Sequence, residues 1–432
     1  MNDLQVSVED LDGLERRLVV QVPANRIDQE VETRLKSVGR TAKLKGFRPG
    51  KVPPSVIRQR YGGQVREEVL QEVVQKSYSE AITQEKIRPA GGPTIEPGTI
   101  ESGKDFTYTA TFEIYPDIEL KGLDKLKVEQ PDVKIDEGDI DAMVATLRKQ
   151  GRTWAPVERK AADGDQVTVD FEGTLDGEPI EGGKGEQVPI VLGEGQMLPD
   201  FESNLVGLVA GDNKSFKLKF PKDYHADELA GKKVQFDVTV NQVEEPVLPE
   251  LDAVFLEAFG VKDGNIEQFR AEVRQNMERE SESRVRAELK QQVMEQLLEA
   301  NAVGIPGVLV EQEAASLRAE SLRNMGITDE QQGPDAEAFR PAAERRVRLG
   351  LLIAAVVQDN GLEVDRERVK QKVDEICAPY DQPEEIKKLY FQNPQLLSQV
   401  ESVVMEDQVV DWLVDKAKIK VSKRKFSELM EA

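Results

Sequence analysis

The hydrophobic pattern of this chain changes in character near Gln166 and again after Pro249. Between these points, short segments alternate apolar and polar residues, as in VQFDVTVNQV, and glycines crowd the links between them. Beyond Pro249, apolar residues recur at the spacing of a helix face. Alternation has the period of a strand, whereas i, i+3, i+4 spacing has the period of a helix. The pattern predicts an antiparallel β domain with one short helix, followed by a helical region.

The first 115 residues combine both patterns. Alternating segments predict strands at residues 5–8, 15–22 and 106–114. Apolar residues four apart predict helices at 23–38 and 54–85. These elements make a compact α+β domain in which two helices flank a turn.

We therefore predict a multidomain α+β fold. Its parts are an N-terminal α+β domain at residues 1–115, a linker at 116–149, the β domain at 150–246 and an all-α C-terminal domain at 247–432. The apolar stripes of the C-terminal helices are broad but discontinuous, and glycine and proline interrupt their connections. Such helices are typical of open arms or a cradle rather than of one tight bundle.

The composition excludes several kinds of site. Cys377 is the only cysteine and His225 the only histidine, which excludes an intramolecular disulfide and leaves almost no scope for a metal site built on these residues. We therefore expect neither a metal nor another cofactor. Aromatic residues make up only 5% of the chain, which argues against a large stacking surface for single-stranded nucleic acid.

No part of the sequence predicts insertion into a membrane. The N-terminus lacks the basic and apolar regions of a secretory signal. The longest run of apolar residues and glycine, at 349–357, is much shorter than the ~20 residues that a membrane-spanning helix needs. We expect a cytoplasmic protein without a membrane partner.

Charge is distributed very unevenly along the chain, which has 58 Lys and Arg, 81 Asp and Glu, and a net charge of −23. Residues 33–66, here called the basic segment, contain no acidic residue. Their cations are Arg34, Lys36, Arg40, Lys43, Lys45, Arg48, Lys51, Arg58, Arg60 and Arg66. So many like charges repel one another, and this favours an anionic partner; the alternative is a solvated face.

A turn interrupts the basic segment at residues 46–54, where the sequence reads GFRPGKVPP. Two glycines and three prolines in nine residues favour a rigid turn and exclude a helix. Phe47 and Arg48 place an apolar ring beside a guanidinium at the tip. We expect Phe47 to be exposed for contact with another protein; the alternative is a ring buried in the domain core.

The turn resembles the ribosome-docking loop of the trigger factor family of bacterial chaperones. That loop has the signature Gly-Phe-Arg-x-Gly-x-x-Pro, matched here by Gly46, Phe47, Arg48, Gly50 and Pro53. Residues 169–238, from VDFEGT to VQFDV, resemble the FKBP-type prolyl isomerase domain inserted in that family. The helical C-terminal region is similar in length and order. The resemblance therefore covers essentially the whole chain.

The resemblance implies docking at the tunnel exit of the large ribosomal subunit, on a ribosomal protein and adjacent rRNA. The residues implied in docking are Lys43, Lys45, Gly46, Phe47, Arg48, Pro49, Gly50 and Lys51. In the family a lysine commonly follows the Phe-Arg pair, whereas this chain has Pro49. One positive charge is lost and the loop is stiffened, so we expect the affinity for the ribosome to differ. The other implied partners are nascent and unfolded polypeptides, and a homodimer when the protein is free.

The resemblance also implies catalysis of cis-trans isomerisation of X-Pro bonds. An apolar cleft favours the twisted amide, lowering a barrier of roughly 18–20 kcal/mol without an acid, a base or a metal. The implied lining is Phe171, Glu181, Met197, Leu198, Phe201, Tyr224 and Phe236. Without the resemblance, Met197, Leu198 and Phe236 would be interpreted as ordinary β core.

Two further residues concern the wall and the rim of this site. Ile180 stands where many FKBP-type domains have phenylalanine, so we expect a thinner wall and a lower activity. His225 follows Tyr224 in a loop, and we expect it at the surface or the rim of the pocket rather than as a catalytic base.

The apolar residues at 349–357 are more numerous than one helix stripe requires. They predict a surface for unfolded polypeptide that includes Leu349, Leu352, Ile353 and Val356; the alternative is a buried central helix. We expect a ribosome-associated chaperone with peptidyl-prolyl isomerase activity. Two other functions account for less of the sequence. A free isomerase leaves the basic turn unexplained, and a nucleic-acid-binding protein leaves the β domain and the acidic helical region unexplained.

Overall fold

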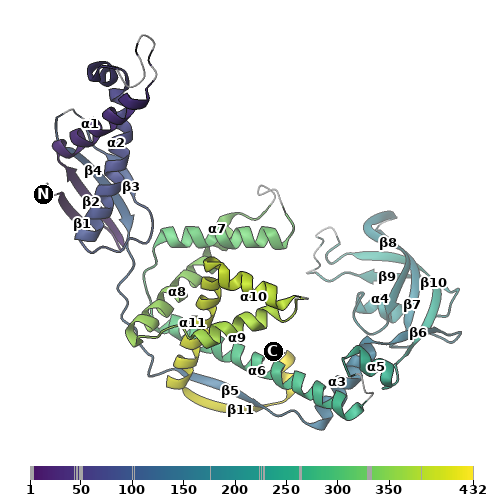
Figure 1. Ribbon diagram of the computed structural model, residues 1–432. Coiled ribbons are helices and arrows are strands. Elements are labelled where there is room, and N and C mark those ends of the chain that lie inside the picture. Colours follow the sequence, from purple (N-terminus) through teal and green to yellow (C-terminus); the bar gives the residue numbers. More distant parts are fainter. Residues whose placement is uncertain are drawn as a thin grey trace. The chain divides into compact units, whose positions relative to one another are not determined.

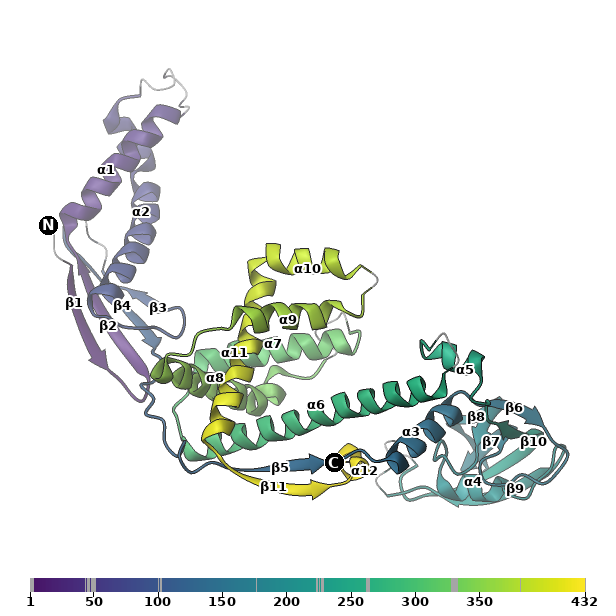
Figure 2. The same ribbon diagram turned by 60° about the horizontal axis from the view of Figure 1, so that its bottom comes forward.

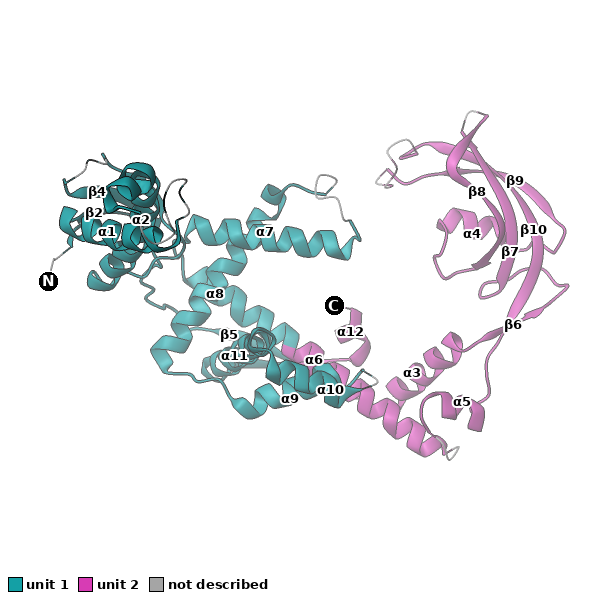
Figure 3. Cartoon of the chain, turned by 45° about the horizontal axis from the view of Figure 1, so that its top comes forward, with its two compact units in different colours: residues 1–130, 287–421 teal, residues 131–286, 422–432 magenta. Residues whose placement is uncertain are grey.

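The structure, a computed structural model, describes residues 4–42, 44, 47, 52–99, 101, 103–175, 177–222, 224, 226, 229–261, 265–327, 333–380 and 382–431. The chain forms two compact units (Figure 3). The first contains residues 1–130 and 287–421, and the second contains residues 131–286 and 422–432.

The N-terminal part of the first unit is an antiparallel sheet with two long helices (Figure 1). The strands are β1 (Gln5–Asp10), β2 (Glu15–Val22), β3 (Thr94–Pro97) and β4 (Phe106–Glu113), in the order β1-β2-β4-β3. The helices are α1 (Ala24–Thr41) and α2 (Pro54–Gln84). They pack against each other, and most residues of the predicted turn between them lie outside the described residues.

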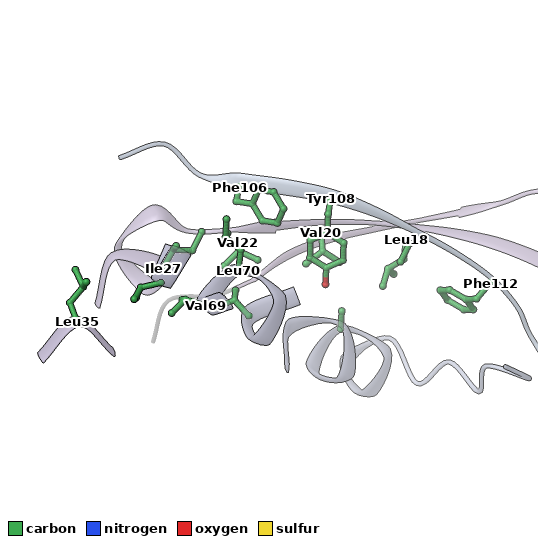
Figure 4. Close-up of a cluster of buried hydrophobic side chains, with 14 of the residues drawn as sticks. Leu18, Val20, Val22, Ile27, Leu35, Val69, Leu70, Phe106, Tyr108 and Phe112 are labelled. Carbon is green, nitrogen blue, oxygen red and sulfur yellow. The ribbon is translucent and has the colours of Figure 1, made fainter. Parts of the chain in front are cut away.

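Alternation along the strands builds the core of this domain. Leu18, Val20 and Val22 of β2 are fully buried, and they face the α2 side together with alternate residues of β4 (Figure 4). The hydroxyl of the buried Tyr108 lies 2.9 Å from the Ser77 hydroxyl of α2, so its polar atom is satisfied inside the core. The strand period therefore fixes which face of the sheet the helices cover.

Most of the rest of the first unit is helical. It contains the C-terminal part of α6 (Ile266–Ala300), α7 (Gly307–Asn324), the short 3₁₀ helix η2 (Ala336–Phe339), α8 (Arg340–Asn360), α9 (Arg366–Cys377), α10 (Pro383–Gln392) and α11 (Pro394–Lys416). Local signals set the ends: Asp365 and Asn393 cap the N-termini of α9 and α11, and Gly361 ends α8 in the left-handed conformation.

Buried apolar residues of α6, α8 and α11, such as Leu297, Leu352 and Leu413, lie in the interior of this region, and smaller clusters join the other helices. Val310 and Ala314 of α7 share a small cluster with Ala343 of α8. Another cluster joins α9 to α11. The structure therefore confirms a helical C-terminal region, with small clusters between neighbouring helices.

The linker is more ordered than its sequence suggests, because β5 (Lys127–Val133) pairs with β11 (Lys418–Arg424) (Figure 2). The strand β11 was not among the predicted elements of the all-α region. Amide side chains of α6 hold the linker on its other side. Gln292 bonds the backbone N–H and C=O of Glu129, and Gln296 bonds those of Lys127, at 2.7–2.9 Å. The long helix thus pairs with the linker much as a neighbouring strand would.

The second unit contains a five-stranded antiparallel sheet. Its strands are β6 (Thr153–Pro156), β7 (Gln166–Leu175), β8 (Glu178–Val191), β9 (Asn213–Lys219) and β10 (Lys233–Val247), in the order β6-β10-β7-β8, with β9 also paired to β10. The short helix α4 (Pro199–Leu205) lies on one face of the sheet (Figure 3), where Phe201 and Leu205 enter the core.

A helical base completes the second unit. It consists of α3 (Glu137–Gln150), α5 (Ala253–Ala258), the N-terminal part of α6 and α12 (Phe426–Glu431). Ile140, Leu256, Phe269 and Phe426 share its core. The ends of the sheet domain meet close together above this base, because Trp154 of β6 pairs with Pro246 of β10.

Candidate functional site

A cavity of about 480 Å³ lies between the sheet of the second unit and α4. All seven side chains expected to line an isomerase pocket border it: Phe171, Glu181, Met197, Leu198, Phe201, Tyr224 and Phe236. Leu218, Phe220 and Leu229 border it too, and the sequence analysis did not single them out. Leu218 and Phe220 belong to a strand and its end, where alternation predicts a core residue but cannot show that it faces a cavity.

Phe201 forms the floor of this cavity. It is 2% exposed and packs edge to face against Phe171, Phe216 and Phe236, with ring centroids 5.3–5.6 Å apart. Aromatic rings prefer this geometry because the positive edge of one meets the negative face of another. The floor is therefore held in place by rings from three different strands.

Glycines make room for the walls. A Cβ at Gly185 would lie 2.7 Å from the ring of Phe171, and a Cβ at Gly173 would lie 2.8 Å from that of Phe236. Ile180 fits into the remaining space, because a Cβ at Gly173 or Gly183 would collide with its side chain. The glycines that crowd this domain therefore serve close packing around the cavity as well as turns.

The rim carries the polar groups. Glu181 is exposed at the edge of the cavity, and the Tyr224 ring packs edge to face on Phe220 at 4.7 Å. His225 lies outside the described residues, so its expected place at the rim stays a prediction. An apolar cavity with a polar rim can hold a proline ring and exclude water from the amide before it.

Phe47 is one of the few residues of the candidate docking loop that the structure describes. It is 40% exposed, and its backbone N–H donates to the carbonyl of Leu44 at 3.1 Å. The alternative of a ring buried in the domain core is therefore wrong. The other expected docking residues lie outside the described residues: Lys43, Lys45, Gly46, Arg48, Pro49, Gly50 and Lys51.

Helix packing neutralises part of the basic segment. Arg34 pairs with Glu72 of α2. Lys36 lies 3.1 Å from Glu32, and Arg66 lies 3.5 Å from Asp28. The pairs of Arg34 and Arg66 join α1 to α2 and could not be seen in the sequence pattern, whereas Glu32 and Lys36 are four residues apart on α1.

The charges of three other arginines are not compensated by a carboxylate among the described residues. Within the part of the chain that the structure describes, Arg40, Arg58 and Arg60 pair with no carboxylate. Arg40 stands in the last turn of α1, and Arg58 and Arg60 stand near the start of α2. The unneutralised charge is therefore concentrated at the loop end of the two helices.

The expected polypeptide surface on α8 is only partly available. Leu352 and Val356 are fully buried, and Leu349 and Ile353 are half-buried. The two buried residues cannot contact a substrate in this conformation, because their side chains already fill the space between helices. For Leu352 and Val356, the alternative of a buried central helix is confirmed.

Large exposed apolar side chains occur elsewhere in the helical region. They include Met325 after α7, Tyr380 before α10, Leu389 and Phe391 on α10, and Val403 on α11, at 43–60% exposure. The sequence analysis missed α10. Its signal was present, because Ile386, Leu389 and Tyr390 recur at the i, i+3, i+4 spacing of a helix face after Pro383.

Within the described ranges, every helix is too short or too polar to cross a bilayer.

Known protein families match consecutive parts of the chain. Residues 4–147 match "Bacterial trigger factor protein (TF)", and residues 265–415 match the C-terminus of the same family. Residues 157–241 match "FKBP-type peptidyl-prolyl cis-trans isomerase", which covers most of the cavity-bearing sheet.

Full-length relatives agree with these matches. The trigger factor of Thioalkalivibrio sulfidiphilus is 46% identical over 427 residues, covering 99% of this chain and 98% of the relative. That of Alkalilimnicola ehrlichii is 46% identical over 429 residues, covering 99% and 95%. A solved structure of the trigger factor chaperone superposes with a TM-score of 0.51 at 19% identity, covering 95% of this chain and 99% of the other, and shows the same fold. The chain therefore belongs to the trigger factor family of ribosome-associated chaperones with an FKBP-type peptidyl-prolyl isomerase domain.

Proposed function

We propose that the protein docks at the tunnel exit of the large ribosomal subunit through the loop between α1 and α2. The proposal rests on an exposed Phe47 in the segment between α1 and α2, together with three arginines near the adjoining helix ends that have no carboxylate partner within the described residues. Phe47 would enter an apolar site on a ribosomal protein. Arg40, Arg58 and Arg60, with the cations of the loop itself, would neutralise phosphates of adjacent rRNA.

The isomerase reaction takes place in the cavity above Phe201. The substrate proline ring would enter between the walls formed by Phe171, Phe236, Met197 and Leu198, with Tyr224 and Glu181 at the rim. Removing the amide from water favours the twisted C–N bond, which has lost its charge separation. No proton is transferred in this step, so none of the lining residues acts as an acid or a base.

Nascent and unfolded polypeptides would bind to the exposed apolar side chains of the arms. Met325, Leu389, Phe391 and Val403 are scattered among charged residues. Leu349 and Ile353 on α8 would contribute their exposed edges, whereas Leu352 and Val356 would support them from inside. Scattered patches give weak binding, which lets a folding chain leave.

The division of labour follows the boundaries expected from the sequence. Residues 1–115 would dock, 116–149 would link, 150–246 would isomerise and 247–432 would hold unfolded chains. The protein would act in the cytoplasm. When it is free of ribosomes, we expect a homodimer that covers part of the exposed apolar surface, which analytical ultracentrifugation can detect.

Co-sedimentation with ribosomes at two salt concentrations tests the docking proposal. Binding through phosphates falls steeply as salt rises. Binding that is insensitive to salt would contradict the role of the basic segment. An unchanged affinity after substitution of Phe47 would contradict the role of the loop tip.

A further inference from the structure

A buried carboxylate lies next to the cavity but does not line it. Glu202 of α4 is 5% exposed. Its Oε2 accepts the backbone N–H of Gly193 at 2.9 Å, and its Oε1 accepts the backbone N–H of Met197 at 2.9 Å. Burial of a carboxylate is costly unless hydrogen bonds compensate it, and these two charge-assisted bonds do so.

Both bonds hold one short loop. Residues 193–198, here called the pocket loop, connect β8 to α4 and end in Met197 and Leu198, which border the cavity. Gly193 and Gly195 have φ values of 85° and 71°, a conformation that favours glycine. Glycine loses much conformational freedom on ordering, so this loop needs anchors to keep a single shape.

The position of Glu202 links the wall of the cavity to its floor. Glu202 follows Phe201 directly on α4, so the same helix turn carries the floor ring and the carboxylate that holds the loop. Any shift of the loop relative to α4 would change the distance between Met197 and Phe201. Catalysis in such a cavity depends on a fixed geometry, because small misplacements of the substrate cost much of the rate.

A second anchor holds the loop from outside. Arg152 donates two hydrogen bonds to Glu194, at 2.6 and 2.8 Å, and its guanidinium lies 4.8 Å from the centre of the Trp154 ring. Glu194 is 41% exposed, so this ion pair is expected to contribute less than the buried one. The inner anchor therefore decides the conformation of the loop.

We propose that Glu202 is a positioning residue of the isomerase, which fixes the pocket loop through Gly193 and Met197 and so sets the shape of the substrate cavity. The proposal rests on the assignment of the cavity as the isomerase site. It concerns a residue that touches no substrate and acts through the loop backbone.

The test compares two buried carboxylates of the same domain in the full-length protein. Glu202→Gln keeps the size of the side chain but turns one acceptor into a donor, which then faces a backbone N–H. Asp165→Asn is the matched control. Asp165 is 2% exposed and accepts the N–H of Ala162 at 2.8 Å and two bonds from Arg159, but it does not border the cavity.

We expect Glu202→Gln to lower kcat/KM on a short X-Pro peptide about tenfold, the scale of one lost charge-assisted hydrogen bond. Amide exchange measured by NMR should become faster at Gly193 and Met197, whereas the N-terminal domain should not change. Asp165→Asn should lower the Tm of the domain at least as much, yet keep kcat/KM within twofold of the wild type below that Tm.

Three outcomes would overturn the proposal. They are a folded Glu202→Gln protein with wild-type kcat/KM, unchanged exchange at both amides, or equal losses of activity in the two variants at equal loss of Tm. If Glu202→Gln does not fold, Glu202→Asp serves instead, since it keeps the charge but cannot reach both N–H groups; its unchanged activity would also overturn the proposal. Phe201→Ala is measured in parallel, because it changes the cavity floor and leaves the contacts of Glu202 with the pocket loop in place. If Phe201→Ala lowers kcat/KM and Glu202→Gln does not, the proposal for Glu202 fails while the assignment of the cavity stands.

Discussion

Replacing Phe201 with alanine removes the floor of the isomerase cavity. The ring is 2% exposed, and its centroid lies within 5.6 Å of the centroids of three other aromatic rings. Truncating a buried phenylalanine of this kind to alanine lowers the free energy of unfolding by about 3–5 kcal/mol. Each aromatic pair accounts for about 0.5–1.5 kcal/mol beyond the buried area. Because domains are stable by about 5–15 kcal/mol, a folded but weakened sheet domain is expected at low temperature.

Activity should fall much further than stability. Without the ring, the cavity of about 480 Å³ extends to the inner side of α4, so the proline is no longer held and water reaches the amide. We expect kcat/KM to fall by roughly a hundredfold, the scale of lost positioning. The assay is isomerisation of a short X-Pro peptide at low temperature, with near-ultraviolet circular dichroism to confirm folding.

A matched control lies in the other unit. Phe112 is 4% exposed in the N-terminal core and packs edge to face on Tyr78 at 5.7 Å. Phe112→Ala should cost similar stability and leave isomerisation unchanged. A folded Phe201→Ala protein with wild-type kcat/KM would refute the assignment of the cavity.

Other predictions concern docking, pH and the division of the chain. Replacing Phe47 and Arg48 with alanine should abolish stable co-sedimentation with ribosomes while circular dichroism stays unchanged, because a loop tip contributes little to the core; wild-type binding by this variant would contradict docking through the loop. Burial raises the pKa of Tyr78 to about 12, so the neutral hydroxyl is favoured in the fold and stability should fall between about pH 10 and pH 12. In Tyr78→Phe, the loss of stability between about pH 10 and pH 12 should be smaller, as measured by unfolding curves at alkaline pH. The same loss in the variant and the wild type would contradict this role of Tyr78. Replacing residues 150–246 with a short Gly/Ser bridge should abolish isomerisation but keep much of the suppression of aggregation, measured by light scattering, since Trp154 and Pro246 already lie side by side. Loss of suppression in a folded variant would instead locate the chaperone surface in the isomerase domain.

Long elements with a clear period were predictable from the sequence. The strand at residues 15–22 has the predicted bounds in the structure, as β2, and the helix predicted at 54–85 is observed as α2 at Pro54–Gln84. Short elements were missed. β3, β6 and β11 depend on pairing with strands distant in sequence, and a segment such as KIKVSKR carries no buried alternation of its own.

The residues of the candidate site also differ in how far they could be predicted from the sequence. The seven expected lining residues came from a family resemblance, because local patterns cannot distinguish a cavity wall from ordinary β core. Glu202 escaped notice for a related reason. An acidic residue in the first turn of a helix is common, and only the folded loop shows that its two oxygens bond Gly193 and Met197.

The sequence by itself determined the order of the domains, the excess of cations at residues 33–66 and the apolar run at 349–357. The tertiary structure decided what these residues can do. It brings Glu72 of α2 to Arg34 of α1 but leaves Arg40 without a carboxylate among the described residues, and it buries Leu352 while exposing Phe391. Local patterns follow from the chain's own period, whereas charge pairing and exposure depend on which distant segments pack together.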